Sequence, residues 1–130
     1  MRNKALEAFE STLTGLLNTI DADLEARYGN TFPRHPARAA AGITANPQYD
    51  GLFALIPKFS AGIGSEFGPG YSLTLRISTL FPVPEAQHAA WENEAIEALR
   101  SKLPAAFPNR DLRISRDTCG WKLHGDLSLN

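Results

Sequence analysis

Apolar and polar residues alternate through the middle of the chain, and this pattern predicts a β-hairpin between Lys58 and Thr79. The second arm alternates Tyr71, Leu73, Leu75 and Ile77 with polar or charged residues. The first arm alternates Phe59, Ala61 and Ile63 with serine and glycine, and Glu66-Phe67-Gly68-Pro69-Gly70 supplies the turn. We predict that Ser65 lies opposite Tyr71 and Phe59 opposite Ile77, because this register places every apolar side chain on one face.

Pro57 ends an apolar run, residues 51–57, that continues the same face towards the N-terminus. Because proline cannot donate to a β-ladder, we expect the first strand at an edge of the sheet, or bulged or bent at this point. The glycines of the hairpin match neither of the common phosphate-binding fingerprints, so we interpret them as turn and strand residues.

A second alternating pattern predicts another hairpin near the C-terminus. The apolar positions are Leu112 and Ile114 in its first strand and Trp121, Leu123, Leu127 and Leu129 in its second. With Asp117-Thr118-Cys119-Gly120 as the turn, Arg116 faces Trp121, Ile114 faces Leu123 and Leu112 faces Gly125. This register again gathers the apolar side chains on one face.

Two further stretches have the three- and four-residue apolar spacing of an amphipathic helix. The stripe in residues 3–28 consists of Leu6, Phe9, Leu13, Leu16, Leu17, Ile20 and Leu24, and the stripe in residues 85–103 of Trp91, Ala95, Ile96, Leu99 and Leu103. Asn3 can cap the first helix, and Gly29 is suited to the left-handed conformation that ends one. Pro84 suits the start of the second helix, and Pro104 is expected to stop it.

The order helix, strand, strand, helix, strand, strand predicts an α+β fold in which residues 1–130 form a single domain. We expect a two-layer sandwich, with a four-stranded antiparallel sheet made of two hairpins and both helices on its apolar face. The sequence does not determine the order of the strands across the sheet.

The composition bears on the environment of the protein. A chain of 130 residues with a formal net charge of −1 has no overall basic field for a nucleic acid or a membrane surface. Cys119 is the only cysteine, no apolar run has the length of a membrane span, and the first residues lack the apolar core of a signal peptide. We therefore expect a cytoplasmic protein that has no membrane association.

The polar face of the predicted sheet is the candidate binding surface. Its members are Ser60, Thr74, Arg76, Arg113, Lys122, His124 and Asp126, with Arg34 and Arg38 from the preceding loop at its rim. Alternatively, this face is simply solvated, as is common for one side of an antiparallel sheet. We expect a small binding or interaction module, which uses this face to bind a protein partner or a small anionic ligand.

Two other functions stay open at this point. His124 could act as the general base of a small hydrolase- or lyase-type enzyme, with Arg113 as its electrostatic partner. The chain could also be a homo-oligomeric assembly protein, such as a homodimer, that pairs through an exposed edge strand.

Several ligand classes are not expected. There is no cofactor motif, and the three histidines are scattered over different elements, so we predict no metal site. His88 and Glu92 lie one helical turn apart, which we interpret as a solvent-facing pair, and Cys119 as a small turn residue. The predicted polar face carries no aromatic residue, which argues against a stacking platform for nucleic acid.

Overall fold

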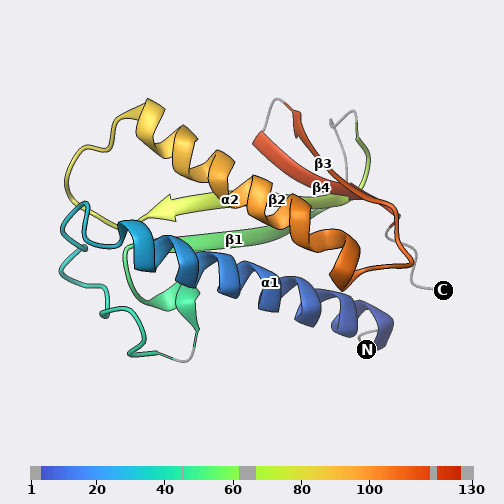
Figure 1. Cartoon of the computed structure of the whole chain (residues 1–130), viewed down its shortest axis with the longest axis horizontal. Helices are drawn as coiled ribbons and strands as arrows, with labels where there is room; N and C mark the ends of the chain where they lie inside the picture. Colours follow the sequence, from blue (N-terminus) through green and yellow to red (C-terminus); the bar gives the residue numbers. More distant parts are fainter. Residues whose placement is uncertain (1–3, 45, 62–66, 118–119, 127–130) are drawn as a thin grey trace.

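The computed structural model describes residues 4–44, 46–61, 67–117 and 120–126. It contains two long helices and four strands in the predicted order. The elements are α1 (Lys4–Tyr28), a short 3-10 helix η1 (Pro47–Tyr49), β1 (Phe53–Ser60), β2 (Gly70–Ile77), α2 (Glu85–Ala106), β3 (Leu112–Asp117) and β4 (Gly120–Gly125). Both helices lie over one face of the sheet, which makes the molecule a two-layer α+β sandwich (Figure 1).

The four strands form one antiparallel sheet in the order β1-β2-β4-β3. The two hairpins are therefore joined through β2 and β4, and β1 and β3 are the edge strands. The edge position of β1 is consistent with Pro57, whose nitrogen has no hydrogen to donate. Pairing between β2 and β4 extends only from Tyr71–Leu123 to Leu73–Trp121, so the second half of β2 has no strand on that side.

The predicted register of the first hairpin is wrong by six residues. Ile77 lies opposite Phe53 rather than Phe59, and Tyr71 lies opposite Phe59. Because six is an even number, the same side chains still share a face, and the apolar pattern is satisfied by either register. The predicted pairings of Ile63, Gly64 and Ser65 lie outside the described residues.

The register of the second hairpin is confirmed. Arg116 pairs with Trp121, Ile114 with Leu123, and Leu112 with Gly125. The ladder continues past the strand ends, where the Asp126 N–H donates to the Asp111 carbonyl at 2.9 Å. The interpretation of Cys119 as a turn residue falls outside the described residues.

The buried stripes of both helices match the apolar pattern. In α2 the buried residues are Trp91, Ala95, Ile96, Leu99 and Leu103, and in α1 they are Phe9, Leu13, Leu17, Ile20, Leu24 and, unexpectedly, Asp21. Pro104 does not stop α2, which continues to Ala106. The extra turn brings Phe107 onto Phe9 of α1, with ring centroids 4.8 Å apart. Gly29 ends α1 without a left-handed backbone, and its N–H donates to the Glu25 carbonyl at 2.9 Å.

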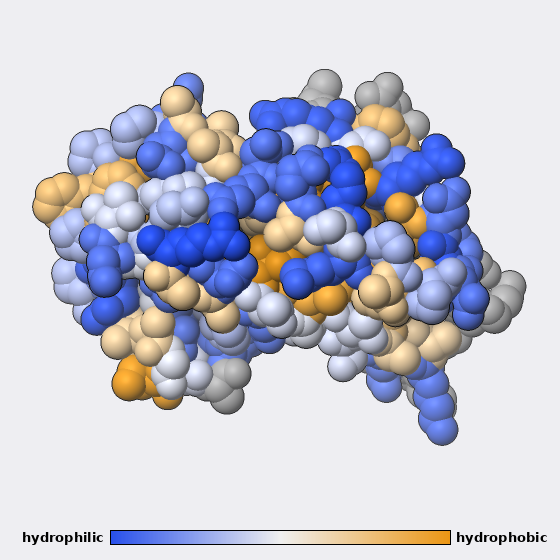
Figure 2. All heavy atoms as spheres, viewed as in Figure 1, coloured by the Kyte–Doolittle hydropathy of each residue, from blue (hydrophilic) through white to orange (hydrophobic). Residues whose placement is uncertain are grey.

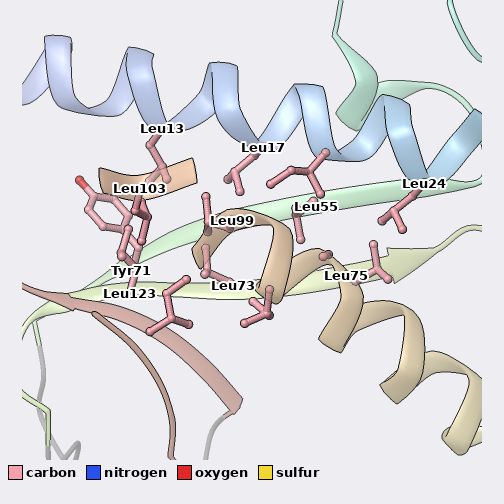
Figure 3. Packing of buried hydrophobic residues seen from close by; sticks show 14 of the residues in the cluster. Leu13, Leu17, Leu24, Leu55, Tyr71, Leu73, Leu75, Leu99, Leu103 and Leu123 are labelled. Carbon is pink, nitrogen blue, oxygen red and sulfur yellow. The ribbon is translucent and has the colours of Figure 1, made fainter. Parts of the chain in front are cut away.

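The core lies between the sheet and the two helices (Figure 3). Leu13, Leu17 and Leu24 of α1 and Leu99 and Leu103 of α2 meet the strand residues, which the same figure labels as Leu55, Tyr71, Leu73, Leu75 and Leu123. Each large side chain buried in this layer contributes roughly 1.5–3 kcal/mol to folding. Seen from the helix side, most of the surface is hydrophilic, with smaller apolar patches between (Figure 2).

Candidate functional site

The polar face of the sheet has a row of side chains that crosses all four strands. Lys58 pairs with Ser72, Ser72 with Lys122, and Lys122 with Ser115. Neighbouring strands lie about 4.8 Å apart, so Lys58 and Lys122 are separated by one intervening strand, about 10 Å. His124 and Arg113, which pair with each other, lie next to this row, as does Ser60, which pairs with Gly70.

Lys122 is the unusual member of this row because it is 3 % exposed. Its aliphatic chain lies against Gly70, where an added Cβ would be 3.1 Å from the Lys122 Cε atom. Among the described residues, no carboxylate forms an ion pair with Lys122. Of the side chains that the structure describes, no buried nitrogen or oxygen lacks a hydrogen-bond partner, so the unpaired Lys122 ammonium group reaches the surface at the end of a buried aliphatic chain. This makes Lys122 the first residue to examine for a ligand.

His124 makes two contacts on this face. Its Nε2 atom lies 2.8 Å from the Ser115 hydroxyl oxygen. Its ring stacks on Phe67, with centroids 4.7 Å apart and planes inclined by 20°. The pKa of His124 is lowered by burial first, and then by the positive charges of Arg113 and Lys122. The imidazole is therefore neutral at pH 7, and its Nε2 atom can accept a hydrogen bond from Ser115.

Phe67 corrects the expectation that no aromatic residue lies on the polar face. The connection between β1 and β2 places this ring on His124, and Phe67 is only partly exposed. A single ring that is already stacked differs from the series of open aromatic rings on which successive bases of a nucleic acid stack.

Arg113 is an exposed cation of the group. Its guanidinium donates to the Asp111 carboxylate at 3.1 Å, and both side chains are largely in solvent. An exposed pair of this kind contributes little to stability, so Arg113 can exchange Asp111 for another anion at low cost.

The remaining predicted residues do not join this group. Thr74 and Arg76 point to the same polar face but lie towards the other end of β2, where Arg76 pairs with Ala54. Asp126 follows β4 and contributes its backbone to Asp111 and Arg110. The predicted site is thus gathered around Lys122, His124, Arg113 and Ser60, and the other residues lie away from its centre.

Arg34 and Arg38 belong to the loop before β1 rather than to the rim of the site. The Arg38 guanidinium donates to the carbonyls of Gly51 at 2.8 Å, Asp50 at 2.9 Å and Phe53 at 3.1 Å. Arg34 in turn donates to the Arg38 carbonyl at 2.8 Å. Arg38 is therefore a structural residue that holds the loop against the start of β1.

The sequence pattern did not lead us to predict the burial of Asp21. Asp21 lies on the buried side of α1, is 2 % exposed, and accepts a hydrogen bond from the Leu55 N–H at 3.3 Å. Burial is the main reason that its pKa is raised to about 7. The signal in the sequence is its place in the apolar stripe, four residues after Leu17 and three before Leu24, where a charged residue is out of pattern.

The described side chains form no group of three histidine, cysteine, aspartate or glutamate residues able to hold a metal ion. Neither helix, over its described residues, is both long enough and apolar enough to span a bilayer.

Comparisons with known proteins give matches over nearly the whole length of the chain. A family model whose description is "Uncharacterised protein" matches residues 4–125. An uncharacterized protein of Borreliella burgdorferi (strain B31) is 35% identical over 117 residues, which cover 90% of this chain and 91% of the relative. No solved structure matches.

Proposed function

The chain belongs to this family of uncharacterised proteins, and we propose from its polar face that it is a binding module for a small anionic ligand. The observation that carries the proposal is the ammonium group of Lys122, which is held at the surface by a buried aliphatic chain and has no carboxylate partner in the described part of the chain. An anion seated beside it would supply the missing opposite charge.

The neighbours of Lys122 support the same ligand class. Arg113 and Lys122 both lower the pKa of His124, which means that their positive potentials overlap at its ring. Ser72 and Ser115 flank Lys122 across the sheet. Their hydroxyls now donate to the Lys58 carbonyl at 3.2 Å and to the His124 Nε2 atom at 2.8 Å, and rotation of either hydroxyl would direct its proton to an anion beside Lys122. A carboxylate or phosphate group fits this set, because it accepts hydrogen bonds from several donors and favours a site with excess positive charge.

The test is a thermal-shift titration with inorganic phosphate, citrate, a sugar phosphate and a nucleotide. Wild type is compared with Lys122→Met, which keeps most of the unbranched apolar chain and removes the charge, and with Lys102→Met on the exposed side of α2 as a control for lost charge. A ligand at a hundred times its Kd stabilises by about 2.7 kcal/mol, which is a shift of several degrees for a domain of this size.

We expect the shift in wild type and Lys102→Met and its loss in Lys122→Met. Without ligand, Lys122→Met should keep about the stability of wild type, because methionine retains most of the buried chain beside Gly70. If Lys122→Met still responds to the anion like wild type, the proposal is wrong.

The hydrolase alternative rests on the 2.8 Å contact between His124 and Ser115, which is the spacing of a base and a nucleophile. An assay of product formation from ester and phosphoester substrates, with the same protein samples, distinguishes this alternative from a binding module. Catalysis by this pair requires product formation that both Ser115→Ala and His124→Gln abolish, whereas a binding module gives a shift without product.

A further inference from the structure

In the part of the chain that the structure describes, most outward backbone groups of β3 have no hydrogen-bond partner. In an antiparallel ladder, alternate residues direct both their N–H and C=O groups towards the same neighbouring strand. Asp111 bonds towards β4, so Arg113 and Ser115 do as well, and the backbone of Leu112, Ile114 and Arg116 points outwards. Within the described residues, the only group that reaches this edge is the Arg100 guanidinium, which donates to the Ile114 carbonyl at 3.0 Å.

A groove runs beside this edge. It has a volume of about 510 Å³ and lies between β3 and the C-terminal end of α2. Leu103, Pro104 and Phe107 from the helix end and Leu112 and Ile114 from the strand supply its apolar surface. Sheet edges in other proteins are usually protected, so an open edge with an apolar groove alongside suits the addition of another strand.

The charges around the groove indicate which strand would fit. Arg100, Arg110 and Arg113 line it, against two carboxylates: Asp111 pairs with Arg113, and Glu97, next to the groove, pairs with Arg100. The remaining excess of positive charge disfavours a second copy of the same edge, because each copy would bring the same excess to the contact. It favours a segment that carries carboxylates.

We propose that the β3 edge binds an extended peptide of alternating apolar and acidic residues as a fifth, antiparallel strand. In this arrangement, peptide residues opposite Ile114 direct their backbone to β3 and their side chains into the groove. Those residues are the apolar ones. The intervening acidic residues lie on the polar side of the sheet, next to Arg113.

The probe is a fluorescein-labelled peptide, Glu-Ile-Glu-Val-Glu-Ile-Glu, whose binding to the full chain is measured by fluorescence anisotropy. Replacing its glutamates by lysines tests the charge. Two N-methylated forms test the backbone, since methyl groups on the isoleucine and valine nitrogens block the edge that faces β3, and methyl groups on the glutamate nitrogens block the other. We expect the lysine peptide and the first methylated form to bind at least about tenfold more weakly, and the second methylated form to bind like the parent.

The matched protein variants are Arg116→Pro and Arg116→Ala. Both remove the same exposed charge, but only proline removes an outward N–H, and neither change affects a hydrogen bond between β3 and β4. We expect at least a tenfold loss of affinity in Arg116→Pro and less than about threefold in Arg116→Ala, with both variants folded by circular dichroism.

The proposal is overturned if the glutamate peptide does not bind, if the lysine peptide binds equally well, or if both Arg116 variants retain affinity. It is also overturned if the free protein dimerises by light scattering and the dimer excludes the peptide, since the occupant would then be a second copy.

Discussion

At two places beside the sheet, helix side chains form hydrogen bonds with backbone groups that have no neighbouring strand. We call each of these places a closure, and the two closures differ in how deeply they are buried. Beside β1, Glu25 of α1 accepts from the N–H of Leu52, which directly precedes the strand, at 2.7 Å, and Asp21, one turn earlier, accepts from the outward N–H of Leu55. On the free half of β2, Glu92 of α2 accepts from the Leu75 N–H at 3.2 Å, and His88, one turn earlier, bonds the Leu75 carbonyl at 2.7 Å.

The His88–Glu92 pair is therefore not the solvent-facing pair that its spacing suggested. It occupies the place that β4 would take if the ladder continued past Leu73. Both helices thus satisfy strand backbone groups with two side chains that are four residues apart, which face the same way on a helix.

The difference between the two closures is burial. Asp21 is 2 % exposed, whereas Glu92 and His88 are only partly buried. A carboxylate inside the protein loses its hydration, which is why Asp21 has a pKa of about 7. Hydrogen bonding of strand backbone by a helix carboxylate therefore becomes dependent on pH when the carboxylate is buried.

The largest expected effect comes from Asp21→Asn at alkaline pH. The folded-state pKa of about 7 lies above the ordinary value of 3.8, so the folded state holds the proton more tightly. The resulting stabilisation is complete below about pH 4 and is lost as the pH rises to 7. Asparagine needs no proton and can still accept from the Leu55 N–H, so the variant should be more stable than wild type at pH 8. Between pH 4 and pH 8, the free energy of unfolding of the variant minus that of wild type should rise by about 2–4 kcal/mol.

Urea denaturation at pH 4, 6 and 8 measures this effect. Asp23→Asn is the control, because Asp23 lies on the exposed side of α1, where it pairs with Arg27 at 2.8 Å. A stability difference between Asp21→Asn and wild type that stays constant across this range would contradict the raised pKa.

The second effect tests the loop that completes the β1 closure. Arg38→Ala should destabilise by about 2–3 kcal/mol, because it leaves the carbonyls of Asp50, Gly51 and Phe53 without the charged donor that they share. Arg34→Ala removes one exposed bond and should change stability by less than about 0.5 kcal/mol. Equal losses in the two variants, measured as urea midpoints, would show that Arg38 does not anchor this loop.

The smallest effect is expected at the β2 closure. Glu92→Ala removes the acceptor for the Leu75 N–H and should cost about 1 kcal/mol, because this partly exposed N–H can find water instead. Glu92→Gln keeps an acceptor and should cost less, and Glu85→Ala on the exposed first turn of α2 serves as the control. Amide hydrogen exchange at Leu75 should be faster in Glu92→Ala only; unchanged exchange there would rule out the Glu92 closure.

The two hairpins show how far local pattern specifies pairing. The short connection from Asp117 to Gly120 leaves one register that keeps Ile114 opposite Leu123, and that register is observed. The connection from β1 to β2 is longer, and any even shift keeps the apolar face intact. The pairing of Phe53 with Ile77 is accompanied by contacts of β1 with Glu25, Asp21 and Arg38, which are distant in sequence.

Some contacts of the candidate site follow from one hairpin, and others depend on how the two hairpins lie beside each other. The pairing of Arg113 with His124 followed from the second hairpin alone. The contact of Lys122 with Gly70 and the stacking of Phe67 on His124 depend on β2 lying beside β4, and no alternation pattern contains that information.

By itself, the sequence determined which residues are helical or extended, which side chains face the core, and that two helices cover one face of an antiparallel sheet. These properties depend on apolar periodicity and short connections, which are local. The folded structure was needed to establish the strand order, the register of the first hairpin, the extension of α2 past Pro104 and the burial of Asp21 and Lys122. These features result from contacts between segments far apart in the chain, where packing and unpaired backbone groups select among arrangements that the local pattern allows equally.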